Sequence, residues 1–417
     1  MTKALTTPWT ERQKGTAVGL IILANFIQSI SVGINVVVFT TALDSYGAST
    51  SVIGLVMAVE YISVFGISMG LPWLLRVFSL RGGLEISTLF RLPALLLLCF
   101  LTEPRHWALV VFVHGIGNFL LGILLQTWIN SIPFTRNRGL VMGLFGTSIS
   151  LGLALGPVLL AVASYFPEQL SALVSFTDQY GKQWFGWTVP AAVSVQTRMG
   201  LVLSALLSTL AVLPVLLGRS MTPRNYDEPK VSMPSVVRRA PAAMYAVMLC
   251  GFTILGLQSF ITVYGLRNGL NMRDASYLLT AFMIGSISLE APIASLSDRF
   301  DRRYVMIALV LLSLVAAVYL PMAVYYKWSA WALLFIWGGM IGALFSICLA
   351  LVAERFNGPD LVAANGAFSI MDNLGGLLGV LAMGFGMDML GEDGFPYAIM
   401  FASVVYFSFA LTRYQVR

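Results

Sequence analysis

Charge is scarce in this sequence. Only 11% of the 417 residues are charged, whereas 58% are hydrophobic. A soluble protein of this length carries about a quarter of its residues as Asp, Glu, Lys and Arg. Because lipid removes the need for a charged surface, the deficit predicts a polytopic membrane protein. The net charge of +6 does not indicate nucleic-acid binding, since the basic residues are scattered in small groups between apolar runs.

Cysteine and histidine are scarce too, with three and two copies. Cys99, Cys250 and Cys348 fall inside apolar runs, so we expect buried thiols rather than disulfides or metal ligands. His106 and His114 form no H-x4-D pair and no metal cluster, and the sequence has no G-x4-G-K-[ST] nucleotide loop. The sequence therefore predicts no enzyme activity, no metal site and no cofactor.

Long apolar runs are abundant. A membrane-spanning helix needs about 20 apolar residues, and only helices or closed barrels satisfy the backbone in lipid. Runs of this length exclude barrel strands, so the predicted fold is an all-α polytopic bundle of twelve transmembrane helices. The predicted spans are at about 17–43, 51–75, 83–102, 107–131, 139–165, 199–218, 242–266, 275–296, 304–326, 328–353, 361–388 and 395–412.

The distribution of Lys and Arg predicts the orientation. With both termini in the cytoplasm, 18 of the 25 basic residues fall on the cytoplasmic side. Cytoplasmic loops are enriched in Lys and Arg, so we expect this orientation in a bacterial cytoplasmic membrane. The opposite side receives six basic residues: Arg105, Lys182, Arg198, Arg267, Arg273 and Lys327.

A linker rich in proline and charge divides six spans from six. We predict an N-terminal six-helix bundle at 14–218, a cytoplasmic central loop at 219–241 and a C-terminal six-helix bundle at 242–412. A glycine pattern, G-x8-G-x3-G, occurs in the fifth span and again in the eleventh, which favours two parallel repeats. Its copies are Gly143, Gly152 and Gly156, and, 223 residues later, Gly366, Gly375 and Gly379.

The densest charge cluster lies between the eighth and ninth spans and reads SDRFDRR (297–303). This segment resembles the D-R-x-x-R-R loop signature of the major facilitator superfamily, and the resemblance extends over the whole chain. It implies two pseudo-symmetric six-helix bundles and a cytoplasmic gating loop formed by Asp298, Arg299, Arg302 and Arg303. These charges could instead serve only to enforce topology. The first-half copy, GLPWLLRVFSLRGG (70–83), keeps Arg76 and Arg81 but has no Asp.

The fifth span is similar to the antiporter motif of that superfamily through Gly143, Gly152, Gly156 and Pro157. It departs at 160–161, where Leu-Ala replaces two glycines. The resemblance leans slightly toward efflux over uptake. The stretches TWIN (127–130), NRG (137–139) and LVAANGA (361–367) are similar to a bacterial branch, the YcaD-like porters, which implies no particular substrate.

Ionisable residues inside predicted spans are expensive at bilayer depth and indicate function by default. Glu60 and Asp372 are the leading candidates for proton coupling, with Glu290 and His114 as further ones. Each could instead be structural, and for Glu290 and His114 the structural interpretation is favoured. Arg91 is expected to extend its guanidinium to the cytoplasmic interface.

Uncharged polar and aromatic residues form the expected substrate cavity. Three amides of the first span are predicted to share one helical face. In the family, spans 1, 4, 7 and 10 line the central path, with spans 2, 5, 8 and 11 beside it. The candidates are Asn25, Gln28, Asn35, Tyr61, Asn118, Gln126, Gln258, Trp337 and Asn373.

These observations predict a monomeric secondary transporter that moves a small organic solute by alternating access, coupled to protons. Its expected partners are the solute, protons and the lipid bilayer. The alternative is a transport-inactive membrane sensor or assembly factor with the same fold.

Overall fold

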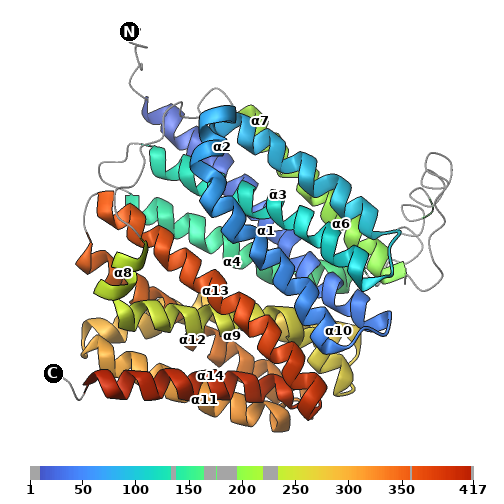
Figure 1. Ribbon diagram of the computed structural model, residues 1–417, viewed down its shortest axis with the longest axis vertical. Helices are drawn as coiled ribbons and strands as arrows, with labels where there is room; N and C mark the ends of the chain where they lie inside the picture. The colour runs from blue at the N-terminus through green and yellow to red at the C-terminus, as the bar shows by residue number, and fades with distance from the viewer. Residues whose placement is uncertain are drawn as a thin grey trace.

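The computed structural model describes residues 10–132, 138–163, 175, 195–218, 233–356 and 359–414. Only the backbone is described at 68–81, 89, 130–131, 138–140, 142–143, 163, 233, 298, 359–363 and 413–414. These residues are almost entirely helical (Figure 1). The helices of the first half are α1 (Glu11–Ser45), α2 (Thr50–Leu98), α3 (Pro104–Ser131), α4 (Arg138–Ala163), α6 (Val195–Leu210) and α7 (Val212–Leu217). Those that follow are α8 (Met233–Arg239), α9 (Pro241–Arg267), α10 (Met272–Ala294), η2 (Ser295–Asp298), α11 (Arg302–Ala323), α12 (Lys327–Arg355), α13 (Pro359–Leu390) and α14 (Gly394–Tyr414).

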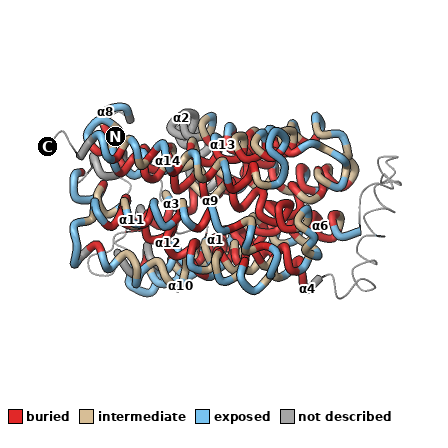
Figure 2. The backbone as a smooth tube through the Cα atoms, turned by 90° about the horizontal axis from the view of Figure 1, so that it is seen from below, coloured by how far each residue is buried: buried red, intermediate tan, exposed pale blue. Residues whose placement is uncertain are grey.

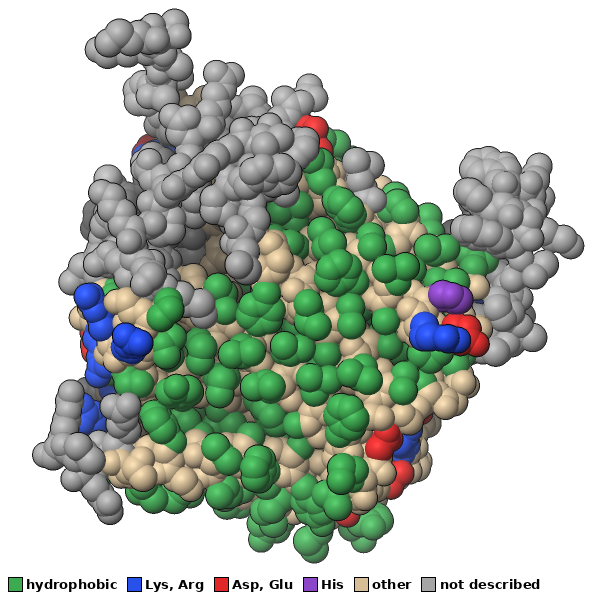
Figure 3. Space-filling model, in the orientation of Figure 1, with side chains coloured by type: hydrophobic (Ala, Val, Ile, Leu, Met, Phe, Trp, Pro, Cys, Tyr) green, Lys and Arg blue, Asp and Glu red, His purple; other side chains and the backbone are tan. Residues whose placement is uncertain are grey.

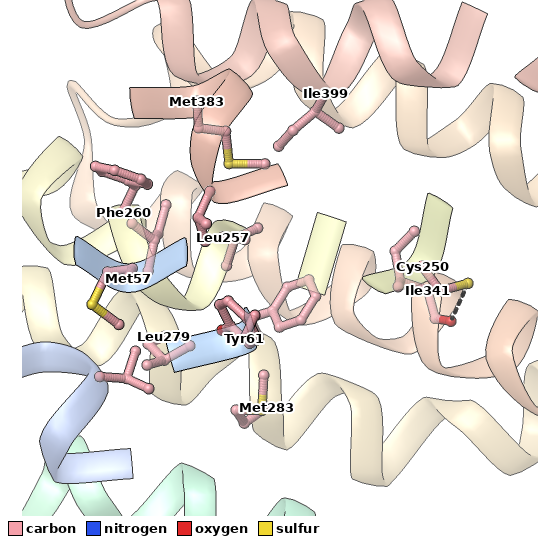
Figure 4. Packing of buried hydrophobic residues seen from close by; sticks show 14 of the residues in the cluster. Met57, Tyr61, Cys250, Leu257, Phe260, Leu279, Met283, Ile341, Met383 and Ile399 are labelled. Atoms are coloured by element: carbon pink, nitrogen blue, oxygen red, sulfur yellow. Dashed lines mark hydrogen bonds between the residues drawn. The ribbon is translucent and has the colours of Figure 1, made fainter. Parts of the chain in front are cut away.

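Eleven helices of the described part are long and apolar enough to cross a membrane. Their outward faces are rich in hydrophobic side chains, which cover most of the face drawn in Figure 3. Met389 and Tyr325, for example, are 80% and 79% exposed. Such a surface suits lipid and not water. Buried residues run through the middle of the bundle (Figure 2), and Figure 4 shows Met57 and Tyr61 of α2 packed among Leu257 and Phe260 of α9.

The second and third predicted spans form one helical run, α2, of 49 residues. A straight helix would place Glu60 and Arg91 about 46 Å apart, at 1.5 Å per residue. However, both contact the same turn of α3, where Gly115 touches Glu60 and Gly117 touches Arg91. The run therefore reverses direction between Ile67 and Gly82 and crosses the bundle twice.

The positions of the two chain ends also require the chain to cross the bundle an even number of times. The start of α1 and the end of α14 lie at the same end of the molecule, on the left in Figure 1. With α2 counted twice, and α6 and α7 together as the sixth span, the helices give the predicted twelve crossings. Two details differ from prediction: the sixth span is interrupted at Ala211, and part of the predicted central loop, Met233–Arg239, is helical.

The two halves contact each other through equivalent pairs of helices. The second predicted span packs on the eleventh as α2 on α13, and the fifth packs on the eighth as α4 on α10. Exchanging the halves converts one pair into the other. A third contact, α1 on α9, joins the first and seventh spans. This pattern is the pseudo-symmetry expected of the fold.

The repeated glycines make the same kind of contact in each half. Gly156 of α4 packs directly on the backbone of Gly33 in α1, and a Cβ at position 156 would lie 2.6 Å from the Gly33 carbonyl carbon. Gly375 and Gly379 of α13 pack in the same way on the backbone of α9. Small residues let helix backbones approach closely in a membrane, where no hydrophobic effect drives helix association.

This contact predicts opposite results for two glycines of α4. Gly156→Ala should destabilise the protein by about 1–3 kcal/mol, because its methyl group overlaps the α1 backbone. A methyl group at Gly146 would meet nothing within 4 Å, so Gly146→Ala should be neutral or slightly stabilising through helix propensity. Thermal unfolding of the purified variants in detergent measures both. Equal melting temperatures would contradict the packing argument.

Candidate functional site

A buried carboxyl, imidazole and amide connect three helices of the first half. Oε1 of Glu60 on α2 lies 3.4 Å from Nδ1 of His114 on α3. Nε2 of His114 lies 3.3 Å from Nδ2 of Asn35 on α1. His114 is fully buried and Glu60 is 9% exposed. A carboxyl beside an imidazole in a low-dielectric interior provides two groups between which a proton can move.

The predicted polar face of α1 is divided between two neighbouring helices. Gln28 donates from Nε2 to the side-chain oxygen of Asn118 on α3. Asn25 donates to the Ser148 hydroxyl on α4 at 2.9 Å. The structure thus groups Gln28 and Asn118 with the α1–α3 contact that also holds Asn35, and it places Asn25 at the α1–α4 contact.

Tyr61 extends the polar region from the first half to the second. Its hydroxyl pairs with the Ser259 side chain on α9, and the carboxyls of Glu60 and Asp372 both lie near enough to act on it electrostatically. Asp372 belongs to α13. This helix packs so closely on α9 that a Cβ at Gly251 would overlap the Asp372 carbonyl. Carboxyl groups from both halves therefore lie within electrostatic range of one tyrosine.

The remaining predicted residues lie outside this central group. Gln258 donates to a methionine sulfur of α10 at 3.9 Å, and Trp337 is fully buried with its indole N–H 2.8 Å from a serine hydroxyl of α11. Asn373 donates to a carbonyl of its own helix, and Gln126 is exposed. Glu290 accepts a hydrogen bond from a serine of α12 at the α10–α12 contact.

The expectation for Arg91 is wrong. Its side chain is only 1% exposed and does not reach an interface; Nη2 donates to the Ser208 hydroxyl of α6 at 2.9 Å. Ser208 in turn lies 2.9 Å from the Ser31 hydroxyl of α1, which lies 2.7 Å from Ser204. Nε and Nη1 of Arg91 have no hydrogen-bond partner among the described residues. The hydroxyls align toward the guanidinium and offset part of the cost of its burial.

The predicted gating loop makes its described contacts inside the second half. Arg302 Nη1 lies 2.5 Å from Oε1 of Glu354 at the end of α12. Asp301 caps α11 by accepting the backbone N–H of Arg303 at 2.9 Å. Arg299 is exposed, and the Asp298 side chain lies outside the described residues. The gating role of this loop remains a prediction.

The opposite ends of the helices carry ionic contacts between the halves, which we call the outer junction. The Asp388 carboxylate of α13 accepts the backbone N–H groups of Thr50 and Ser51 at 2.9 Å each, and both of their hydroxyls. Asp44 of α1 pairs with Arg267 of α9 at 2.6 Å. An anion at the N-terminus of α2 also suits the helix dipole. These contacts hold α2 to α13 and α1 to α9 at one end of the molecule.

Cavities among the described residues do not coincide with the central polar group. One, of about 810 Å³, is apolar and lies between α9, α13 and α14. A second, about 270 Å³, lies close to the outer junction between the halves and is bounded by α1, α4, α6, α9 and α10. Thr41 and Ser45 of α1 line it.

Solved transporter structures share this architecture. The nucleoside transporter NupG superposes with a TM-score of 0.71 at 14% identity, over 96% of this chain and 99% of that one. A bacterial homolog of the human lysosomal transporter Spinster, in an inward-facing and occupied conformation, gives 0.73 at 13% identity, over 98% and 97%. At these identities the likeness establishes the fold alone.

Sequence comparison identifies the family. The profile of the Major Facilitator Superfamily matches residues 268–416. The uncharacterized MFS-type transporter YfkF of Bacillus subtilis is 24% identical over 91% of each chain. Both comparisons support the resemblance to transporters of the major facilitator superfamily. YcaD of Escherichia coli, also an uncharacterized MFS-type transporter, is 22% identical over 66% of this chain and 63% of its own.

These comparisons confirm several predictions. They support a multi-pass membrane transporter with bacterial relatives, the matching family consists of transporters and not enzymes, and the expected similarity to YcaD is real but distant. Sequence reasoning missed the outer junction, because Asp388 and Asp44 stand at predicted span ends, where charge is unremarkable. It also missed Ser259, since nothing in the sequence separates this hydroxyl from the many others in the spans.

The outer junction predicts a change in exposure when Asp388 is neutralised. Asp388→Asn removes the charge and places an amide against donor groups, so the outer ends of α2 and α13 should separate more often. Charge-assisted hydrogen bonds contribute about 1.5–3 kcal/mol each, so a rise of about tenfold or more in accessibility is expected. The measure is the labelling rate of a Thr41→Cys variant by a membrane-impermeant maleimide.

Glu392→Gln is the matched control, because Glu392 is exposed in the loop that follows α13. It removes a carboxylate at the same end of the molecule without touching α2. The native cysteines are buried, so they add little background labelling. Identical labelling rates in Asp388→Asn and Glu392→Gln would show that the junction does not hold the halves together.

Proposed function

We propose that this transporter moves a small organic solute by alternating access and that proton movement through Glu60 and Asp372 drives it, with efflux slightly favoured over uptake. The protein would lie in a bacterial cytoplasmic membrane as a monomer with both termini inside. Secondary transport itself follows from the family. What we propose beyond this is the class of the substrate, the identity of the coupling ion and the direction of transport.

The observation that carries the proposal is the packing of α2 on α13, which brings one carboxyl from each half within electrostatic range of Tyr61. Glu60 comes from α2 of the first half and Asp372 from α13 of the second, and these helices pack on each other between the halves. A movement of the halves would change the distance between the two carboxyls. Proton affinity depends on nearby charge and on solvation, so such a movement can couple proton binding to the conformation.

The polar side chains around this group favour an uncharged or weakly charged solute. Gln28, Asn35 and Asn118 provide amides, and Tyr61 provides an aromatic ring with a hydroxyl. A phosphorylated solute would call for several arginines in the cavity. In the described spans, Arg91 is the arginine buried at the level of the central polar group. It faces the serines of α1 and α6, so its guanidinium is directed there and not toward a solute phosphate.

Proton flux in reconstituted vesicles tests the proposal. Purified protein is reconstituted with an entrapped pH indicator, and a panel of vitamins, siderophores, amino acids and drugs is added singly on one side. We expect at least one solute to cause proton movement in the native protein. Glu60→Gln and Asp372→Asn should each reduce that movement to the level of protein-free vesicles, because neither amide can carry a proton.

Glu103→Gln is the control, since Glu103 is exposed at the start of α3 and should retain full coupled flux. Solute counterflow without a pH gradient separates coupling from transport, and the neutralised variants should retain counterflow. Coupling that survives in both variants would remove these carboxyls from the mechanism. Tight solute binding without translocation in the native protein would favour the sensor or assembly factor instead.

A further inference from the structure

Four arginines surround a small pocket at one end of the C-terminal half. The pocket has a volume of about 220 Å³, and Arg238, Arg239, Arg303 and Arg355 line it. Arg238 and Arg239 end α8, Arg303 lies in the first turn of α11, and Arg355 ends α12. All four are exposed. They sit where candidate membrane spans begin or end, which is the level of the lipid headgroups.

The deeper wall of the pocket is apolar. Met306 and Ile307 of α11, Leu351 of α12 and Phe409 of α14 lie about one helical turn further into their spans than the arginines. The pocket therefore has a cationic mouth at the membrane surface and a hydrocarbon-like side that continues toward the bilayer. A soluble anion would need the cationic mouth but not the apolar side.

Among the described residues, the side chains that line the pocket carry positive charge and include no carboxylate. Glu354 is next to Arg355 in the sequence, but its carboxylate pairs with Arg302 at 2.5 Å. Arg355 donates from Nη1 to the backbone carbonyl of Arg239 at 2.7 Å, which fixes the end of α12 beside α8. Several guanidinium groups held around one small space repel one another and favour an anion between them.

We propose that this pocket binds the phosphate of an anionic phospholipid, with an acyl chain lying along the apolar wall. Guanidinium groups bind phosphate oxygens through paired, charge-assisted hydrogen bonds. Basic pockets between membrane helices attract anionic headgroups for this reason. The bound lipid would join the ends of α9, α11, α12 and α14 to α8, the helix at the end of the central loop. The site is separate from the central polar group and does not depend on its role in proton coupling.

Binding of short-chain lipids to the full-length protein in detergent tests the site. The probes are dioctanoyl phosphatidylglycerol, dioctanoyl phosphatidylcholine and inorganic phosphate, titrated at constant ionic strength and followed by thermal unfolding and by native mass spectrometry. Phosphatidylglycerol should bind saturably and raise the melting temperature, whereas the other two should bind far more weakly. Arg238→Gln and Arg303→Gln should each weaken phosphatidylglycerol binding about fivefold, from the usual attraction of one basic residue to an anionic surface.

Arg105→Gln is the control, because Arg105 is exposed at the start of α3 and far from the pocket; it should bind phosphatidylglycerol like the native protein. Three results would overturn the proposal. Equal affinity for phosphatidylcholine would show that the headgroup charge is not recognised. Phosphate binding as tightly as phosphatidylglycerol would indicate a soluble phosphate ligand. An equal loss of phosphatidylglycerol affinity in Arg105→Gln and in the pocket variants would indicate non-specific attraction of the lipid to the protein surface.

Discussion

The constraint that shapes this protein is the absence of water at bilayer depth. A polar group there must find its partner within the protein, since lipid offers none. The amides of α1 meet this constraint through α3 and α4, and the Ser31 hydroxyl meets it through two serines of α6. Each such contact fixes which face of one helix meets another. The polar residues thus determine the helix arrangement in a bundle whose apolar faces would suit lipid equally well.

Close backbone packing supplies the second part of the arrangement. Gly33 and Gly156 bring α1 and α4 together, and Gly375 brings α13 onto α9. These contacts lie inside each half, where they make the halves rigid. The contacts between the halves include a close backbone approach of Gly54 on α2 to Gly384 on α13 and, beside it, the ionic pairs of the outer junction. Ionic pairs near water contribute little each and can open at a modest cost. Rigid halves joined by separable contacts are what alternating access requires.

Most of the fold could be predicted from the sequence, because hydropathy and charge asymmetry report directly on crossings and loops. The reversal inside α2 was predicted as a loop at 76–82, although the backbone stays helical there. Arg91 shows where such reasoning fails. Depth along a span can be read from the sequence, but the direction of a side chain depends on which neighbour stands beside it. The serine that accepts from Arg91 lies more than 110 residues away on α6, the Ser31 hydroxyl that it contacts lies about 60 residues away on α1, and no local pattern indicates either.

In the candidate site too, some features could be predicted from the sequence and others depend on how the helices pack. Glu60 and Asp372 could be singled out because carboxyls are costly in a span, but bringing both within electrostatic range of Tyr61 required the packing of α2 on α13. Those two helices also carry the main part of the outer junction, at Thr50 and Asp388. Thr50 and Glu60 are about 15 Å apart along α2, and Asp372 and Asp388 about 24 Å apart along α13. Because each of these helices carries a junction residue at one end and a carboxyl further along, separation at the junction changes how the two carboxyls face each other. The proposed coupling thus needs no signal passing from residue to residue, since two helices hold both the junction and the titratable groups.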